Sequence, residues 1–215
     1  MDVVALLLAA GGSERMGAPK ALLPWHGQPL LTHQVHEIQK SRISECVVIL
    51  GEDPDRMGDL VRPRRALHSA WKSRWIYNPR HQEGKTASIL AGLTALCDRP
   101  DGLFVIAVDQ PIEHRLLDAL MNAAEAEWDR GEAVARRSIV LPVYRGRRGH
   151  PPLFAGGLFA ELMGISEASE GLRAVVRRQD ERVLEMPWEG AEVLLNLNAP
   201  VDLPAPPARH KTLHA

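Results

Sequence analysis

The segment that ends at Lys20 constrains this chain more than any other. Val3 to Leu8 is a short apolar run, which predicts a buried strand. It breaks directly into Ala9 to Gly12, four small residues that let backbone N–H groups approach an anion closely. Arg15 and Lys20 add two positive charges to the same loop, and a polyphosphate requires such charges. A strand, a small-residue loop and two cations together predict a nucleoside triphosphate site.

A plain turn is the alternative for this loop, because glycine-rich turns are common after a first strand. The P-loop pattern does not fit. Gly12 and Gly17 have its spacing, but Ala18 and Pro19 stand where lysine and serine or threonine are needed. The dinucleotide pattern GxGxxG is also absent. If the loop binds phosphates, it does so in another way.

Length and composition fit one globular domain. The chain has 215 residues, of which 45% are hydrophobic and 25% charged, with a formal net charge of −1. It can bury a sizeable core, and no global field draws it to nucleic acid or to a membrane. Its two cysteines, Cys46 and Cys97, border apolar segments and suggest no disulfide framework. The apolar stretch near Met1 is too short for a signal or a membrane span, so we expect a cytoplasmic protein.

Strand-like and helix-like segments alternate along the chain, which predicts an α/β domain with a mainly parallel sheet. We expect strands at 3–8, 46–50, 75–77, 103–108, 138–144, 183–187 and 193–197. Helices are expected around 31–38, 89–97, 116–124, 157–163 and 170–178. Pro142 argues for an edge strand or a bulge. One domain should cover 1–203, and the Pro-, Ala- and His-containing segment 204–215 should be a disordered tail.

Ligands of an open α/β sheet bind beyond the carboxyl ends of its strands, so the loops that follow the strands are the candidate site. Asp109 comes directly after an apolar strand, where its carboxylate would suit Mg²⁺ held jointly with phosphates. A helix cap or an Asx turn before Pro111 is equally compatible. Asn78 and the segment 83–88 precede a strongly periodic helix. They could either cap that helix or bind a ligand. The loop 144–154 is dense in cations and glycines, which fits either a solvated loop or an anion site.

The string from Leu8 to Lys20, LAAGGSERMGAPK, resembles the signature of nucleotidyltransferases with a glycosyltransferase-A-like fold, including the molybdenum cofactor nucleotidyltransferases. Further similar motifs follow in the family's order: Val-Asp-Gln-Pro at 108–111, Gly-His-Pro at 149–151 and Asn-Leu-Asn-Ala-Pro-Val-Asp at 196–202. The resemblance covers about residues 4 to 202. It implies a single Rossmann-like domain with three layers, α/β/α.

The resemblance also implies a role for each matching residue. Binding of the nucleoside triphosphate falls on Leu8, Ala9, Ala10, Gly11, Gly12, Ser13, Arg15 and Lys20, with Asn78, Gly84 and Ser88 beside the base. The implied catalytic residues are Arg15, Lys20 and Asp109. Asp109 and Asn198 would hold Mg²⁺ as the cofactor. The pocket for the acceptor would be lined by Gly149, His150 and Arg173, and a phosphorylated acceptor would explain Arg145, Arg147 and Arg148.

The implied reaction transfers a nucleoside monophosphate from a nucleoside triphosphate, with CTP favoured, to a phosphorylated acceptor of the molybdopterin type, releasing pyrophosphate. A transient contact with a molybdoenzyme or its chaperone is implied too. Two departures weaken the cytidylyltransferase reading: Ser169 stands where that branch has aspartate, and Asn196 and Asn198 replace two aspartates, as in the guanylyltransferase branch. Guanylyl transfer, transfer to a sugar or polyol phosphate, and a nucleotide-binding accessory protein without turnover stay open.

Overall fold

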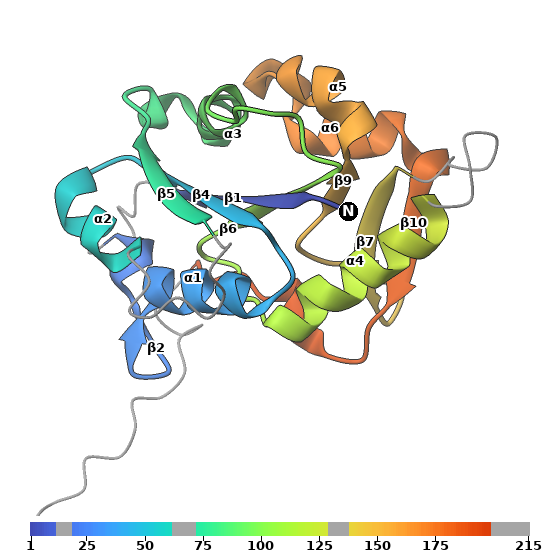
Figure 1. Ribbon diagram of the computed structural model, residues 1–215, viewed down its shortest axis with the longest axis horizontal. Helices are drawn as coiled ribbons and strands as arrows, with labels where there is room; N and C mark the ends of the chain where they lie inside the picture. Colours follow the sequence, from blue (N-terminus) through green and yellow to red (C-terminus); the bar gives the residue numbers. More distant parts are fainter. Residues whose placement is uncertain (12–18, 62–71, 129–137, 199–215) are drawn as a thin grey trace, which may run out of the picture.

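The computed structural model describes residues 1–11, 19–61, 72–128 and 138–198. Over these residues a mostly parallel sheet of eight strands lies between two layers of helices (Figure 1). The predicted α/β class, the mainly parallel sheet and the three layers are therefore confirmed. The predicted tail at 204–215 lies outside the described residues.

The strands are ordered β10-β7-β9-β6-β1-β4-β5. Neighbours pair in parallel, except that β9 is antiparallel to both β6 and β7 and the short β8 is antiparallel to β7. The bounds are β1 Val3–Ala9, β4 Glu45–Leu50, β5 Lys72–Tyr77, β6 Gly102–Ala107, β7 Ile139–Tyr144, β8 Arg147–Arg148, β9 Leu153–Ala155 and β10 Val183–Pro187. A separate hairpin consists of β2 Pro24–Trp25 and β3 Gln28–Pro29.

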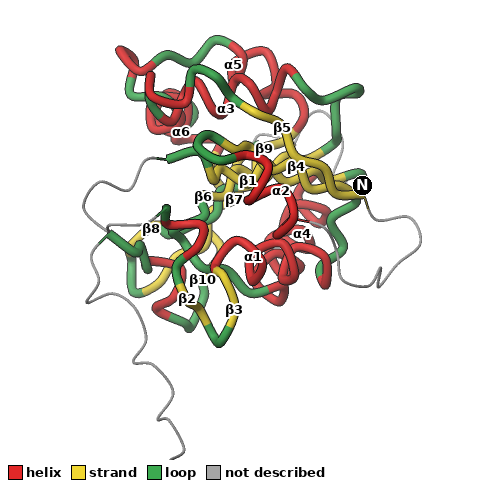
Figure 2. The backbone as a smooth tube through the Cα atoms, turned by 90° about the vertical axis from the view of Figure 1, so that its left-hand side faces the viewer, coloured by secondary structure: helices red, strands yellow, loops and turns green. Residues whose placement is uncertain are grey.

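One face of the sheet is covered by α1 Leu30–Lys40, α2 Pro54–Val61 and α4 His114–Trp128, and the other by α3 Lys85–Thr94, α5 Phe159–Met163 and α6 Leu172–Arg178 (Figures 1 and 2). Short 3-10 helices are η1 Lys20–Leu22, η2 His81–Glu83, η3 Gly156–Leu158, η4 Glu167–Ser169, η5 Asp180–Arg182 and η6 Ala191–Leu194. Within the described ranges, none of the helices has the length and apolar character needed to cross a bilayer.

The core lies on both faces of the central strands. Along β1, Val3, Ala5 and Leu7 belong to the apolar cluster under α1 and α4, whereas Val4, Leu6 and Leu8 belong to the cluster under α3. Successive side chains of a strand point to opposite faces, so a strand buried on both faces must be apolar throughout. The unbroken apolar run that opens the chain is thereby explained.

The strand expected at 193–197 is wrong. The chain forms the 3-10 helix η6 there and then runs extended without a ladder partner in the sheet. Val193 and Leu197 point into the core, with exposures of 2% and 0%, but they lie four residues apart because the 3-10 turn separates them. A local pattern of alternating apolar residues resembles a strand and cannot reveal that turn.

Of the two alternatives that Pro142 suggested, an edge strand or a bulge, the edge position is wrong, because β7 has partners on both sides. Proline lacks an N–H group, so it needs a place where the ladder does not use one. On one side of β7, pairing with β9 ends at Val140 and pairing with β8 begins at Val143. Pro142 lies in that interruption, and its carbonyl accepts a hydrogen bond from Gly149 N at 2.7 Å. An interruption of the ladder therefore accommodates the proline inside the sheet.

The connections diverge at the centre of the sheet. From β1 the chain proceeds to β4 and β5 on one side, and from β6 it proceeds to β7 on the other. Because β1 and β6 are adjacent and parallel, the loops after them leave the same edge in opposite directions. Such a switch point leaves a crevice between the two loops, and ligands of open α/β sheets bind there. The loop after β1 and Asp109 border this crevice.

Candidate functional site

Three of the predicted site residues meet at the switch point. The ammonium group of Lys20 donates to Asp109 Oδ2 at 2.7 Å and to Asn198 Oδ1 at 3.0 Å. The Lys20 and Asp109 side chains retain 18% and 19% of their exposure, so the ion pair is largely shielded from water. Asp109 and Asn198 thus bind the same ammonium group, although they lie 89 and 178 positions from Lys20 in the sequence.

Backbone packing holds each member of this cluster. Lys20 opens η1, and the next residue, Ala21, is 2% exposed and anchors that turn in the core. Asp109 follows β6 and Val108, whose N–H donates to the Leu8 carbonyl at 3.0 Å. The Asp109 carbonyl in turn accepts from Leu197 N at 2.8 Å. Asn198 is thereby held beside Asp109 even though its own side chain is exposed.

The donor set of this cluster fits a hard divalent cation. A carboxylate and an amide oxygen converge on a single cationic group, and Mg²⁺ prefers oxygen ligands of this kind. No group of three or more His, Cys, Asp or Glu suited to a metal occurs among the described residues. Asp109 and Asn198 could therefore supply only part of the coordination, and phosphate and water oxygens would complete it, as is usual for Mg²⁺ bound with a nucleotide.

The loop after β1 begins buried and ends open. Leu8, Ala9 and Ala10 are 7%, 4% and 4% exposed, whereas Gly11 is exposed. A Cβ atom on Gly11 would meet none of the described atoms within 4 Å, so packing does not demand glycine there. The bare backbone instead stays accessible to a ligand. Gly12, Ser13 and Arg15, also predicted to bind the nucleotide, lie outside the described residues.

Glycine is required on the neighbouring strand end. A Cβ atom on Gly51 would lie 2.7 Å from the Ala10 carbonyl oxygen and 2.8 Å from Cγ of His81. The loops after β1, β4 and β5 therefore approach one another closely at Gly51, with the His81 ring packed against its backbone. This contact brings the segment that starts at Asn78 next to the small-residue loop.

The predicted base-side residues Asn78 and Ser88 bond to each other. Asn78 is 2% exposed, its Nδ2 donates to Ser88 Oγ at 3.1 Å, and its Oδ1 accepts from Arg80 N at 3.0 Å. Gly84 has φ +111°, which disfavours any side chain, and the Glu167 carboxylate packs against it. These residues shape the segment between β5 and α3. Their contact with a base stays a prediction.

Gly149 and His150, which were predicted to line the acceptor pocket, pack against η6. Gly149 has no room for a side chain, because a Cβ atom would lie 2.6 Å from the Val193 carbonyl oxygen. His150 N donates to that same carbonyl at 2.8 Å, and the following bond to Pro151 is cis. The loop is therefore fixed to the segment that leads to Asn198.

The pKa of His150 responds to charged groups on α3, on α6 and in the loop after β6. Although the His150 ring stays accessible, the protein atoms around it lower its pKa by desolvation. Lys85 and Arg173 lower the pKa further, while Asp109 opposes them. Lys85 and Arg173 are exposed, and in the described parts of the chain neither has a carboxylate partner. Two uncompensated cations beside a neutral imidazole suit an anionic ligand.

The arginines of the β7–β8 turn are less well suited to this task. Arg148 is bound by two carboxylates, with contacts of 2.5 Å to Asp180 and 2.7 Å to Glu185. These two contacts link β8 to η5 and to β10. The Arg145 guanidinium lies 5.1 Å from the centre of the Tyr144 ring. A phosphorylated acceptor is therefore not needed to explain Arg148.

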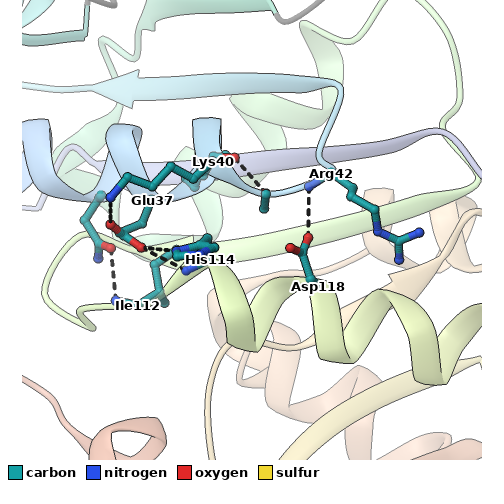
Figure 3. A network of polar contacts seen from close by, with 9 residues as sticks. Glu37, Lys40, Arg42, Ile112, His114 and Asp118 are labelled. Atoms are coloured by element: carbon teal, nitrogen blue, oxygen red, sulfur yellow. Dashed lines mark hydrogen bonds and ion pairs between the residues drawn. The ribbon is translucent and has the colours of Figure 1, made fainter. Parts of the chain in front are cut away.

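Sequence reasoning missed two residues of α1 that hold the Asp109 loop. Gln34 is fully buried and bonds to the stretch between β6 and α4, and Glu37, which is 8% exposed, bonds to His114, the first residue of α4. Figure 3 shows Glu37 between Lys40 and His114. A signal was present, since Gln34 interrupts the apolar stripe of Leu31, Val35 and Ile38. A glutamine on the buried face of a helix needs partners, and these are loop backbone groups.

With this geometry described, the chain can be compared with known proteins. The family model for the MobA-like NTP transferase domain matches residues 5–183. The chain therefore belongs to the MobA-like NTP transferase family, as the sequence motifs suggested.

Individual relatives carry different names. The chain is 28% identical over 217 residues to a probable molybdenum cofactor guanylyltransferase of Synechococcus elongatus, covering 94% of this chain and 96% of that protein. It is 27% identical over 191 residues to a nicotine blue oxidoreductase of Paenarthrobacter nicotinovorans, covering 82% of each. A solved nucleotidyl transferase from Methanothermobacter shares the fold, with a TM-score of 0.72, 20% identity and 94% coverage of both chains.

Proposed function

We propose that this protein is a Mg²⁺-dependent nucleotidyltransferase that transfers a nucleoside monophosphate to a phosphorylated acceptor of the molybdopterin type. The observation that carries the proposal is the convergence of Lys20 on Asp109 and Asn198 at the switch point. One cationic group and two oxygen ligands at the carboxyl edge of a parallel sheet are what a triphosphate and its metal require.

In the proposed reaction an oxygen of the acceptor phosphate forms a bond to the α-phosphorus while the bond from that phosphorus to the β-phosphate breaks. Asp109 and Asn198 would hold Mg²⁺, which neutralises phosphate charge and orients the α-phosphate. Lys20 would exchange its contacts for the phosphates and stabilise charge on the leaving pyrophosphate, aided by Arg15. Backbone amides of residues 8–12 would hold the nucleotide. The acceptor phosphate is already ionised, so no side chain needs to remove its proton.

The acceptor would lie on the side of His150, Lys85 and Arg173. The two cations would bind the phosphate of the acceptor and place its oxygen toward the α-phosphorus. His150, whose lowered pKa keeps its ring neutral at pH 7, would serve as a hydrogen-bonding group rather than a charge. The Asp109 carboxylate opposes the lowering of the His150 pKa.

CTP is the donor favoured by the Gly149-His150-Pro151 motif, and GTP is the alternative. GTP is supported by the relatives that are named guanylyltransferases and by the asparagines at 196 and 198. The experiment that tests the function is pyrophosphate release by the purified protein with Mg²⁺ and each of CTP, GTP, ATP and UTP. Molybdopterin is offered as acceptor, with sugar and polyol phosphates in parallel reactions.

The proposal expects pyrophosphate release with one nucleotide and molybdopterin only. Release with a sugar or polyol phosphate instead would keep the reaction and change the acceptor. A thermal shift on nucleotide binding with no release under any condition would identify a non-catalytic nucleotide-binding protein. The relative named as an oxidoreductase makes this test of turnover necessary, since family membership alone does not fix the reaction.

A further inference from the structure

The side chain of Gln34 supplies hydrogen bonds to the loop that carries Asp109. Its Nε2 donates to the carbonyls of Val108 at 3.1 Å and Gln110 at 2.8 Å, on either side of Asp109, and lies 3.5 Å from the carbonyl of Ala107. Its Oε1 accepts from Ile112 N at 3.1 Å. One fully buried amide thus bonds to backbone groups before and after the aspartate.

These loop groups depend on Gln34 because the sheet does not pair all of them. Val108 and Gln110 lie beyond the end of β6, their carbonyls accept from Gln34, and Pro111 has no N–H group to offer. Leaving a buried carbonyl without a donor is unfavourable, so the loop would rearrange if the amide were lost. The polar side chain on the apolar face of α1 therefore has a defined task.

The hold on the loop extends to the second predicted metal ligand. The Asp109 carbonyl accepts from Leu197 N at 2.8 Å, and Leu197 immediately precedes Asn198. At the other end of the loop, Glu37 accepts from His114 N at 3.0 Å. The position of Asp109 relative to Asn198 thus depends on the backbone of residues 107–114, which Gln34 and Glu37 of α1 hold by hydrogen bonds.

We propose that Gln34 is a positioning residue that sets the geometry of Asp109 and Asn198, and thereby the affinity of the site for a divalent cation. The inference rests on the proposed function, in which these two residues hold the metal. Gln34 itself touches neither metal nor substrate. Its effect should therefore appear in metal affinity and not in the metal-free affinity for nucleotide.

The test compares Mn²⁺ binding, followed by electron paramagnetic resonance, in wild type, Gln34→Met, Gln39→Met and Asp109→Asn. Each protein is titrated with α,β-methylene-CTP and, separately, α,β-methylene-GTP present. Gln39 is a matched control, because it is another glutamine of α1, 2% exposed, placed nearer the opposite edge of the sheet. Gln34→Asn, which keeps the amide on a shorter side chain, is the second variant should Gln34→Met fail to fold.

We expect Gln34→Met to raise the Mn²⁺ dissociation constant about tenfold, the usual effect of losing a residue that orients a ligand, and Gln34→Asn to raise it at least about threefold. Gln39→Met should stay within about twofold of wild type. Nucleotide affinity without metal should be the same in wild type and in the Gln34 and Gln39 variants. If Asp109→Asn weakens Mn²⁺ binding and neither Gln34 variant does, the inference is wrong. If Asp109→Asn leaves Mn²⁺ binding unchanged, the proposed metal site itself fails.

Discussion

At the scale of single residues, the proposed function gives Lys20 two roles that compete. Its ammonium group lies against the two oxygens that would bind a metal, while a triphosphate needs the same charge. A positive group 2.7 Å from a shielded carboxylate opposes the binding of a second cation there. The arrival of nucleotide and metal together would resolve this competition, because the phosphates attract Lys20 away from Asp109.

Lys20→Met should therefore have opposite effects on catalysis and on metal binding. Pyrophosphate release should fall about 10²- to 10³-fold, since a preorganised charge at the leaving group is lost. Mn²⁺ binding without nucleotide should tighten, measured by electron paramagnetic resonance. Lys72→Met is the control, because Lys72 is an exposed lysine at the start of β5. An unchanged rate of pyrophosphate release in Lys20→Met would remove Lys20 from the catalytic residues.

Gly149 offers a second test at this scale. Gly149→Ala would place a Cβ atom 2.6 Å from the Val193 carbonyl oxygen. Relieving this clash requires the backbone to shift, which costs more than moving a flexible side chain. We expect the free energy of unfolding to fall by about 1–3 kcal/mol. Gly157→Ala is the matched control, because nothing described lies within 4 Å of a Cβ atom there, and its change should stay within about 0.5 kcal/mol. Urea denaturation measures both, and equal stabilities would refute the packing assigned to this loop.

At the scale of elements, polar contacts join α1 and the residues just after it to α4. Glu37 accepts from Lys40 at 2.7 Å and from the ring of His114 at 2.8 Å (Figure 3). Burial by itself would raise the pKa of this carboxyl group, but the hydrogen bonds from Lys40 and His114 prevail and hold the pKa at about 2. The same picture shows Asp118 of α4 accepting from the backbone of Arg42, just beyond α1.

The lowered pKa makes this contact sensitive to acid. The folded pKa of Glu37 is below its ordinary value of 4.5, so its contribution to stability is complete above about pH 5 and is lost as the pH falls toward 2. Glu37→Gln should be less stable than wild type by about 2–3 kcal/mol at pH 7. Urea denaturation between pH 7 and pH 3 should show the difference shrinking. A difference that does not change with pH would contradict the ionic role of Glu37.

Element boundaries show where sequence patterns carry enough information. The periodic helix α3 and the apolar strands β1, β4 and β6 are predictable, because each is buried along a continuous face. The three-residue strand β9 has no such pattern, and its pairing with β6 and β7 depends on residues far apart in sequence. The apolar spacing at Val193 and Leu197 is shared by a strand and a 3-10 turn, so tertiary packing decides between them.

At the scale of the whole molecule, the site is a consequence of strand order. Lys20 and Asp109 follow neighbouring strands of the sheet, so their proximity could be expected once the sheet was known to be parallel. Asn198 could be placed there only through the resemblance. It lies beside Asp109 because the neighbouring Leu197 donates a hydrogen bond to the Asp109 carbonyl, and not because it belongs to a strand of the sheet. Gln34 stands out in the sequence as a polar residue on the apolar stripe of α1, but its partners are backbone groups, which carry no sequence signature, so its contact with the Asp109 loop could not be predicted.

The metal dependence of pyrophosphate release tests the central claim most directly. Mg²⁺ is titrated into wild type and Asp109→Asn at saturating nucleotide and molybdopterin, and the half-saturating concentration is compared. We expect Asp109→Asn to need at least about tenfold more Mg²⁺, because a carboxylate ligand becomes a neutral amide. Identical titration curves would show that the metal is not held at Asp109 and that the Lys20–Asp109–Asn198 cluster is not the reaction centre.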